Sequence, residues 1–263
     1  MNAPLGTPDA VLRPSVAARA ITVERCRPSP ALAAFVDYHW YVGWRTVEPH
    51  RQQVVPQPRV HLAAEDGRLL VHGINREAFV RTLTGTGHTL GAAFHPGGFR
   101  PLLRRGVGSL SGCVVPADEL FGVDDRPFAS RVQAAVAIPV MVEALESYLI
   151  GLGPKPDPVV DEVRALVEAA ESDRGMNRAE DLAAQGSMSL RSLQRLFTEY
   201  VGVGPKWVVA RFRILDAAAA AHSGEPVDWA ALAVELGFTD QAHLTRAFTS
   251  VVGTPPATYQ RNA

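Results

Sequence analysis

Cysteine and long apolar runs are both scarce in this sequence. Only Cys26 and Cys113 occur among its 263 residues. Two thiols cannot build a disulfide scaffold or a four-cysteine zinc site, so a reduced setting is expected. No apolar run approaches the ~20 residues of a membrane-spanning helix, and the opening MNAPLGTPDAVLRPS lacks the basic region and apolar core of a secretion signal. We therefore expect a cytoplasmic protein with no membrane partner.

An excess of charge of one sign is also missing. The formal net charge is -1, and 47% hydrophobic with 20% charged residues is typical of a globular chain. A chain of 263 residues has room for two domains, each with its own core. From Ser189 onward the charges nearly balance, with one net positive charge. If this region binds nucleic acid, binding must therefore depend on individual side-chain contacts more than on overall electrostatic attraction to the phosphates.

The stretch SLRSLQRLFTEY, residues 189–200, predicts a short helix with one exposed polar face. Ser189 is a favourable N-cap, and apolar residues recur at helical spacing at Leu190, Leu193, Leu196 and Phe197. This pattern leaves Arg191, Gln194 and Arg195 pointing outward. Arg can pair with both major-groove acceptors of guanine and Gln can do the same for adenine, so this face has the chemistry of base readout. Taken alone, it is equally well explained as a solvated helix surface.

A second copy of the pattern lies downstream. Four positions recur 51 residues later, where Leu193, Arg195, Phe197 and Gly202 are matched by Leu244, Arg246, Phe248 and Gly253. A short helical segment precedes each copy, LAAQGSMS and then LAVELGFTD, so the layout is helix, turn, helix twice over. Residues 205–221 predict one long connecting helix. Two such units that enter successive major grooves should lie about 34 Å apart.

Residues 176–259 resemble the double helix-turn-helix domain of AraC/XylS-type transcription regulators. The resemblance rests on SLRSLQRLF, VGVGPKWVVARFRI, LAVELGFTDQAHLTRAF and VGTPPATY, in the family's order and spacing. It implies base contacts from both units, by Arg191, Gln194 and Arg195 in the first and by Gln241, Ala242, His243 and Arg246 in the second. One departure concerns the first turn, where Gly186 and Ser187 stand in place of an apolar residue followed by glycine.

Contacts to DNA phosphates are expected from exposed polar and basic side chains of the same region. Such contacts would set the register of the protein on DNA without reading its sequence. Helix starts are predicted at a capping box of Asn177 with Glu180, and at the N-caps Asp228 and Thr239. The predicted phosphate contacts are Ser192, Lys206, Arg211, Arg213, Thr239 and Thr245.

The sequence upstream predicts a β-rich domain. Short strand-like runs follow one another from Gln52 to Val115, namely QQVVP, RVHLAAE, GRLLVHGI, AFVRTLTG, HTLGAAF and GCVVP. A strand at 20–25 and a short helix at 31–37 come before them, and a helical stretch at 127–152, kinked or divided by Pro139, comes after. The fold class is therefore α+β. The expected organisation is a flexible leader at 1–18, a β-rich sensory or oligomerisation domain at 19–152, a linker at 153–158 and the DNA-binding domain at 159–263.

Aromatic and histidine side chains gather in the β-rich part. The cluster Tyr38, Trp40, Tyr41 and Trp44 is typical of a core strand with one wet edge, and alternatively of a ligand-pocket wall. We take Trp40, Trp44, His61 and His95 as candidate pocket residues. No pair of histidines has the helical i, i+4 spacing of a zinc motif, although His61 and His72 could face each other on neighbouring strands. We assign no metal ligands, no catalytic residues and no cofactor.

The β-rich part also resembles poorly characterised N-terminal domains of one branch of AraC-type regulators, through AFVDYHWYV, VVPQPRVHL and FHPGGF. This resemblance implies a sensory or oligomerisation role and names no ligand. The leading hypothesis is thus a regulator that binds double-stranded DNA in a sequence-specific manner and is not an enzyme. A small-molecule effector, RNA polymerase and a second copy in a homodimer are its further expected partners. The alternative is an enzyme or metal-binding β-domain fused to a regulatory DNA-binding domain, using the histidines or a reactive thiol, although Cys113, next to Val114 and Val115, is expected to be buried.

Overall fold

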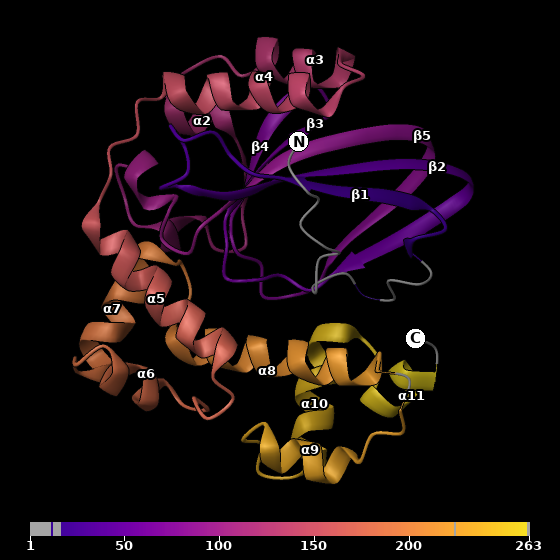
Figure 1. The fold of residues 1–263 in the computed structure, drawn as a ribbon, viewed down its shortest axis with the longest axis vertical. Coiled ribbons are helices and arrows are strands. Elements are labelled where there is room, and N and C mark those ends of the chain that lie inside the picture. Colours follow the sequence, from indigo (N-terminus) through magenta and orange to yellow (C-terminus); the bar gives the residue numbers. More distant parts are fainter. Residues whose placement is uncertain (1–11, 13–16, 224, 262–263) are drawn as a thin grey trace.

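The computed structural model describes residues 12, 17–223 and 225–261, and it places a β-sheet domain against a wholly helical domain (Figure 1). This arrangement confirms the α+β prediction. Most of the predicted leader lies outside the described residues. Within that segment, Leu12 is buried and its backbone N–H donates to the Gln53 carbonyl at 3.1 Å. No helix in the described part of the chain is long and apolar enough to cross a membrane.

Within the described residues, six antiparallel strands form one sheet in the order β1-β2-β5-β3-β4-β6. The predicted runs merge, because one strand passes from the aromatic cluster through QQV and another joins AFVRTLTG to HTLGAAF. Glycine does not end the second of these strands, since Gly85, with a φ of 65°, lies at the register shift where the long partner strand bends. The strands are β1 Ile21–Cys26, β2 Val36–Val54, β3 His61–Glu65, β4 Arg68–His72, β5 Phe79–Phe94 and β6 Val114–Pro116.

The short helix predicted at 31–37 is wrong. The chain makes a hydrogen-bonded turn there, in which the N–H of Phe35 and that of Val36 both donate to the Leu32 carbonyl. Val36 already belongs to β2 and pairs with Phe94 of β5. Burial of Phe35 and Val36 against the sheet therefore overrides the local helix signal of the Ser-Pro start.

One face of the sheet is covered by helices α3 and α4 (Figure 1). Leu62, Val71 and Leu90 from the strands pack with Leu145 and Leu149 of α4 in a single apolar cluster. The predicted division at Pro139 is confirmed, because this residue lies in the first turn of α4. The segments on this side are the 3-10 turns η1 Arg100–Leu102 and η2 Val107–Leu110 and the helices α2 Ala117–Phe121, α3 Arg126–Ala134 and α4 Ile138–Gly151.

A buried polar pair ties β2 to α4 on this covered face. His39 Nε2 lies 2.9 Å from Glu146 Oε1, and the backbone N–H of Ser29 donates to the same oxygen at 2.8 Å. Burial opposes ionisation of Glu146, yet the hydrogen bonds from His39 and Ser29 prevail and hold its pKa below the ordinary value. The face of β2 that carries His39 therefore packs against the helices, and the opposite face of this strand is left for other contacts.

The helical domain consists of two helix-turn-helix units joined by a long helix, as predicted. Ser189 caps the first recognition helix by accepting from the Ser192 N–H, and Asp228 caps α9. Two other predicted caps are wrong: Arg178 and Asp181 form the start of α6, and Asp240 is the N-cap of α10. The helices are α5 Pro158–Ser172, α6 Ala179–Gln185, α7 Leu190–Tyr200, α8 Pro205–Ala221, α9 Trp229–Glu235, α10 Gln241–Val252 and α11 Pro256–Arg261.

The two helix-turn-helix turns differ in one residue that carries backbone strain. Ser187 has a φ of 50° in the first turn, where the second turn has Gly237 with a φ of 75°. A left-handed conformation costs a residue with a Cβ about 1 kcal/mol more than it costs glycine. The departure from the family pattern seen in the sequence therefore leaves the turn geometry intact at an energetic cost.

We predict that Ser187→Gly stabilises the chain by about 0.5 to 1 kcal/mol, because it removes this strain. Thermal or urea unfolding of the full chain measures the change. Ser223→Gly, at an exposed helix end with no left-handed strain, is the control and is expected to give no gain. Equal or lower stability of Ser187→Gly would contradict the strain assignment.

Candidate nucleic-acid interface and ligand pocket

The first recognition helix, α7, buries one face and exposes the other. Leu193 and Phe197 are fully buried in the core of the helical domain. Arg191, Gln194 and Arg195 are exposed, and no ion pair within the described residues involves either arginine. These three side chains are therefore free to meet base edges or phosphates.

The second recognition helix, α10, repeats this layout with a less open polar face. Leu244 and Phe248 are buried, while Gln241, Ala242, His243 and Arg246 are exposed. The His243 ring packs edge-on against Phe238 at 5.2 Å between centroids, and its Nδ1 lies 3.4 Å from the Thr239 hydroxyl. Asp240 uses a carboxylate oxygen to accept from the His243 N–H at 2.7 Å. Two groups at the start of this helix are thus engaged within their own turn.

Among the predicted phosphate contacts, Arg211 and Arg213 are wrong. Both lie on α8 and are buried, with 3% and 2% of their surface exposed. Arg213 lies within hydrogen-bonding distance of the carbonyls of Ala170, Asp173 and Met176, and it pairs with Asp216 at 2.7 Å. Lys206, Ser192 and Thr239 are exposed and Thr245 is half-buried, so these four stay candidates.

A cavity of about 250 Å³ lies on the face of the sheet opposite α3 and α4. Trp40, Trp44 and His61 line it, whereas His95 stands outside, with its Nδ1 3.8 Å from Asp37. The remaining lining is mainly apolar and includes Ile21, Val23, Val42, Val54, Phe79 and Leu83.

Two glycines of β5 make room for the tryptophans of β2. Trp40 is paired in register with Gly91, and Trp44 with Gly87. A Cβ on Gly91 would stand 2.4 Å from the Trp40 ring, and one on Gly87 would stand 2.5 Å from the Trp44 ring. Each indole therefore lies across a bare stretch of the neighbouring strand and forms part of the cavity wall.

Charged side chains in the cavity wall are paired within the protein. Arg81 lies 2.8 Å from Glu65, and His72 lies 3.3 Å from the same carboxylate. Arg59 pairs with Asp37. Burial, with the neighbouring His72, Arg59 and Arg25, lowers the pKa of His61 to about 3, so this ring is neutral.

The β-sheet domain holds the carboxyl ends of both recognition helices. Near the end of α7, the Ser111 hydroxyl donates to the Gly202 carbonyl, and Arg100 pairs with Glu199 at 2.6 Å. At the end of α10, the Gln53 side-chain amide donates to the Val252 carbonyl at 3.2 Å. The amino-terminal halves, which carry the candidate base-reading residues, make none of these contacts.

Helix α8 is held by a buried arginine. Arg211 donates to the Arg76 carbonyl at 2.6 Å, and its guanidinium stacks on Trp207 at 4.5 Å. Its Nη1 has no hydrogen-bond partner, and burial lowers its pKa to about 10. No carboxylate in the described part of the chain pairs with it. Burial of a cation whose hydrogen-bond acceptor is a backbone carbonyl opposes docking at this junction.

Two protein-family models match the chain. A "Helix-turn-helix domain" matches residues 182–262, and a "Domain of unknown function (DUF6597)" matches residues 24–116. The C-terminal part is an AraC-type helix-turn-helix domain. The chain is therefore a DNA-binding transcription regulator, and the resemblance seen in the sequence is confirmed.

Solved structures of ToxT from Vibrio cholerae are similar to this chain. One shares 11% identity over 92% of this chain and 97% of ToxT, with a TM-score of 0.43. A structure of ToxT bound to unsaturated fatty acid shares 11% identity over 99% and 97% of the two chains, with a TM-score of 0.42. At such TM-scores the likeness does not indicate what this regulator binds. No curated protein matches the sequence.

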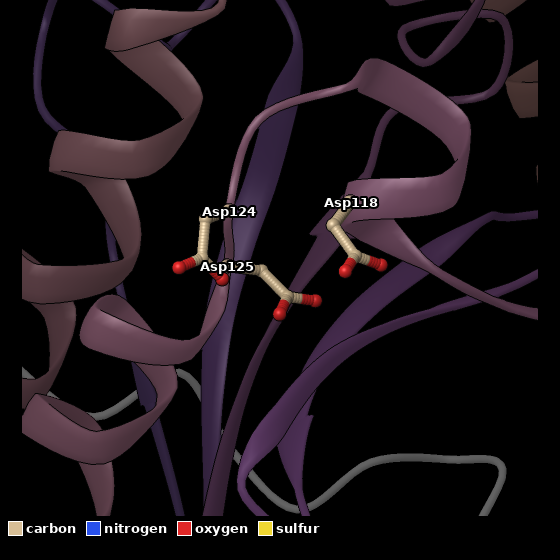
Figure 2. Close-up of side chains that lie close together, drawn as sticks. All are labelled: Asp118, Asp124 and Asp125. Carbon is tan, nitrogen blue, oxygen red and sulfur yellow. The ribbon is translucent and has the colours of Figure 1, made fainter.

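The acidic residues that could form a metal site in this regulator make contacts that hold elements of the fold together. In the described part of the chain, one cluster of three potential metal ligands is found, Asp118, Asp124 and Asp125 (Figure 2). Arg68 pairs with Asp118 and with Asp125, the latter at 2.9 Å, and the Leu69 N–H donates to Asp125 at 3.1 Å. This arginine already supplies the positive charge, so the cluster joins β4 to the start of α3.

Cys26 does not have the surroundings of an activated thiol. Burial, with a contribution from Glu24, raises the pKa of Cys26, which opposes formation of the thiolate. Cys113 is exposed at the cavity rim and not buried as expected. The reason is that the two valines beside it belong to β6, a short edge strand, while Cys113 itself precedes that strand.

The sequence reading missed several residues of the cavity and of the domain junction. Gly87 and Gly91 could have been noticed, because their spacing of four equals that of Trp40 and Trp44, but pairing them requires the strand register. Gln53 and Ser111 carry no signal in the sequence, since single polar residues at strand ends and in loops are common.

We predict that Arg195→Ala weakens binding to a selected operator by about 1 to 3 kcal/mol without loss of stability, because this exposed side chain has the chemistry of guanine readout. Lys206→Ala is the matched control. It should weaken binding to all sequences alike and reduce the salt dependence by about one charge. Titrations against operator and scrambled DNA at several salt concentrations measure both effects. An unchanged operator affinity for Arg195→Ala would remove it from the interface.

Proposed function

We propose that this chain is a cytoplasmic regulator that reads operator DNA with α7 and α10 and responds to a small molecule held in the cavity of its β-sheet domain. One observation carries the second part: the loops that line the cavity also hold the helical domain. Val54 and Val55 neighbour Gln53, Ile74 and Asn75 neighbour Arg76, and Gly112 neighbours Ser111. A molecule that displaces these loops displaces the contacts to both helix-turn-helix units.

The orientation of the recognition helices supports the DNA-binding geometry. Helix-turn-helix proteins place the amino-terminal residues of the recognition helix against base edges. In α7 and α10 these residues are exposed, and the opposite ends are held by the β-sheet domain. The β-sheet domain therefore limits the relative movement of the two recognition helices while leaving their exposed amino-terminal residues accessible to DNA.

The junction at Arg211 supports a reversible response. Docking α8 on the β-sheet domain buries a guanidinium that has no carboxylate partner among the residues the structure describes, which offsets part of the gain from apolar burial. A junction weakened in this way can be opened by the modest binding energy of a small molecule, because a ligand shifts an equilibrium only by its differential affinity for the two states.

Further partners belong to the same proposal. Regulation at promoters implies contact with RNA polymerase. The exposed Val136 and Val140, at the end of α3 and the start of α4, offer an apolar surface for a second copy in a homodimer. No particular observation favours the competing enzyme function.

The two units should contribute unequally to base readout. Arg191, Gln194 and Arg195 are free, whereas Asp240 and His243 are engaged in the first turn of α10. We predict that base substitutions in the operator half under α7 cost about 1 to 3 kcal/mol each, and those under α10 clearly less. Selection of an operator from random DNA, followed by single-base substitution and titration, measures this. Equal or larger costs under α10 would overturn the assignment.

We predict that the double variant Gln53→Ala, Ser111→Ala lowers operator affinity about threefold to tenfold. The double variant lacks the two hydrogen bonds from Gln53 and Ser111 that restrain the helix-turn-helix units, each worth about 0.5 to 1.5 kcal/mol. The units are then more mobile in the free protein, so they lose more conformational freedom when they bind DNA. Ser109→Ala is the control, because its hydroxyl bonds within its own loop to Gly106. Titration with the same operator compares the three proteins. An operator affinity of the double variant equal to that of the parent would show that the β-sheet domain does not position the recognition helices.

A further inference from the structure

The cavity walls favour a flat apolar guest. Trp40 and Trp44 lie across glycines of β5 and line the cavity, so their rings offer surfaces on which an aromatic ring can stack. The guanidinium of Arg81 lies over part of this surface, 5.9 Å from the centroid of the Trp44 ring. The volume of about 250 Å³ lies just below the ~300–1,000 Å³ typical of small-molecule sites. A molecule of one or two rings fits this space, and a peptide does not.

The charge pattern of the walls favours an uncharged guest. Arg81 with Glu65, and Arg59 with Asp37, are already paired. A carboxylate entering the cavity would compete with Glu65 or Asp37 for these guanidinium groups, and an ammonium group would compete with the arginines for these carboxylates. The entering charge also loses its hydration, which opposes its binding.

His61 offers a hydrogen-bond donor to the guest. Trp40 Nε1–H donates to His61 Nδ1 at 3.2 Å. A neutral imidazole that accepts at Nδ1 carries its proton on Nε2, so Nε2–H is a donor. Within the described residues, no hydrogen bond to His61 Nε2 is found. The tryptophan therefore sets the tautomer of a donor in the cavity wall.

We propose that the cavity takes an uncharged planar aromatic molecule that offers one hydrogen-bond acceptor, such as a ketone oxygen, to Nε2–H of His61. This proposal rests on the proposed effector function and names the class of molecule. Stacking on the two indoles supplies most of the affinity, and the bond to His61 selects for the acceptor.

Three probes of the same shape test the class with the full chain. They are 4-ethylacetophenone, the carboxylate 4-ethylbenzoate and the hydrocarbon 1-ethyl-4-isopropylbenzene. Quenching of tryptophan fluorescence gives the dissociation constant of the ketone, and displacement of the ketone gives those of the other two. The ketone is expected to bind about fivefold tighter than the hydrocarbon, in line with one hydrogen bond. It should bind at least about tenfold tighter than the carboxylate, because of the cost of the buried charge.

His61→Phe is the decisive variant, and His95→Phe is its matched control, since His95 lies outside the cavity. In His61→Phe the ketone should lose its advantage while the hydrocarbon binds as before, which also shows that the cavity is folded. His95→Phe should keep the parental order of the three probes. A ketone advantage that survives in His61→Phe would overturn the role of the donor.

The remaining outcomes separate this proposal from the proposed function. Tightest binding by 4-ethylbenzoate would overturn the uncharged class while leaving a ligand-binding cavity. Failure of all three probes to bind would overturn the aromatic class and count against an effector in this cavity. Operator binding by the same protein, measured without any probe, tests the DNA-binding function independently.

Discussion

Burial of two loop residues in the core of the DNA-binding domain is the contact on which the two-domain arrangement depends. Val55, after β2, and Ile74, after β4, belong to the same apolar cluster as Val208 and Phe212 of α8. They draw the loop ends of the sheet onto the long connecting helix. The polar contacts of Gln53 and Arg76 with the helical domain lie beside this packing, near Val55 and Ile74 in the chain. The same loops line the cavity, so the cavity and the recognition helices are held by the same segments of the chain.

Much of the helical domain could be predicted from the sequence, because its signals are local. Ser189 and Asp228 stand directly before apolar residues at helical spacing, and each satisfies backbone N–H groups of its own helix. The second recognition helix begins one residue later than predicted. Two adjacent side chains, Thr239 and Asp240, can both cap a helix, and only the backbone path decides between them.

Predictions that depended on tertiary context failed or stayed open. Arg211 and Arg213 alternate with apolar residues in VVARFRIL, and their charge alone predicted that both side chains are exposed to solvent. A helix with apolar residues on all sides is instead buried, and its arginines are buried with it. The continuity of β2 and β5 depends on strand pairing across dozens of residues, which no local pattern records. His61 lies in the cavity and His95 does not, because that difference follows from the face of each strand and the path of the turn after β5.

The position of Arg213 has a consequence for where the DNA-binding domain begins. Its guanidinium bonds the carbonyls of Ala170, Asp173 and Met176, groups at and just beyond the carboxyl end of α5 that have no partner further along that helix. Helix α5 is thus terminated by a side chain that arrives from the middle of α8. The matched family region starts at residue 182, after all three of these carbonyls. A fragment cut at that boundary would leave the Arg213 side chain inside an apolar core without these three carbonyls, so we infer that the smallest DNA-binding fragment that folds by itself includes α5.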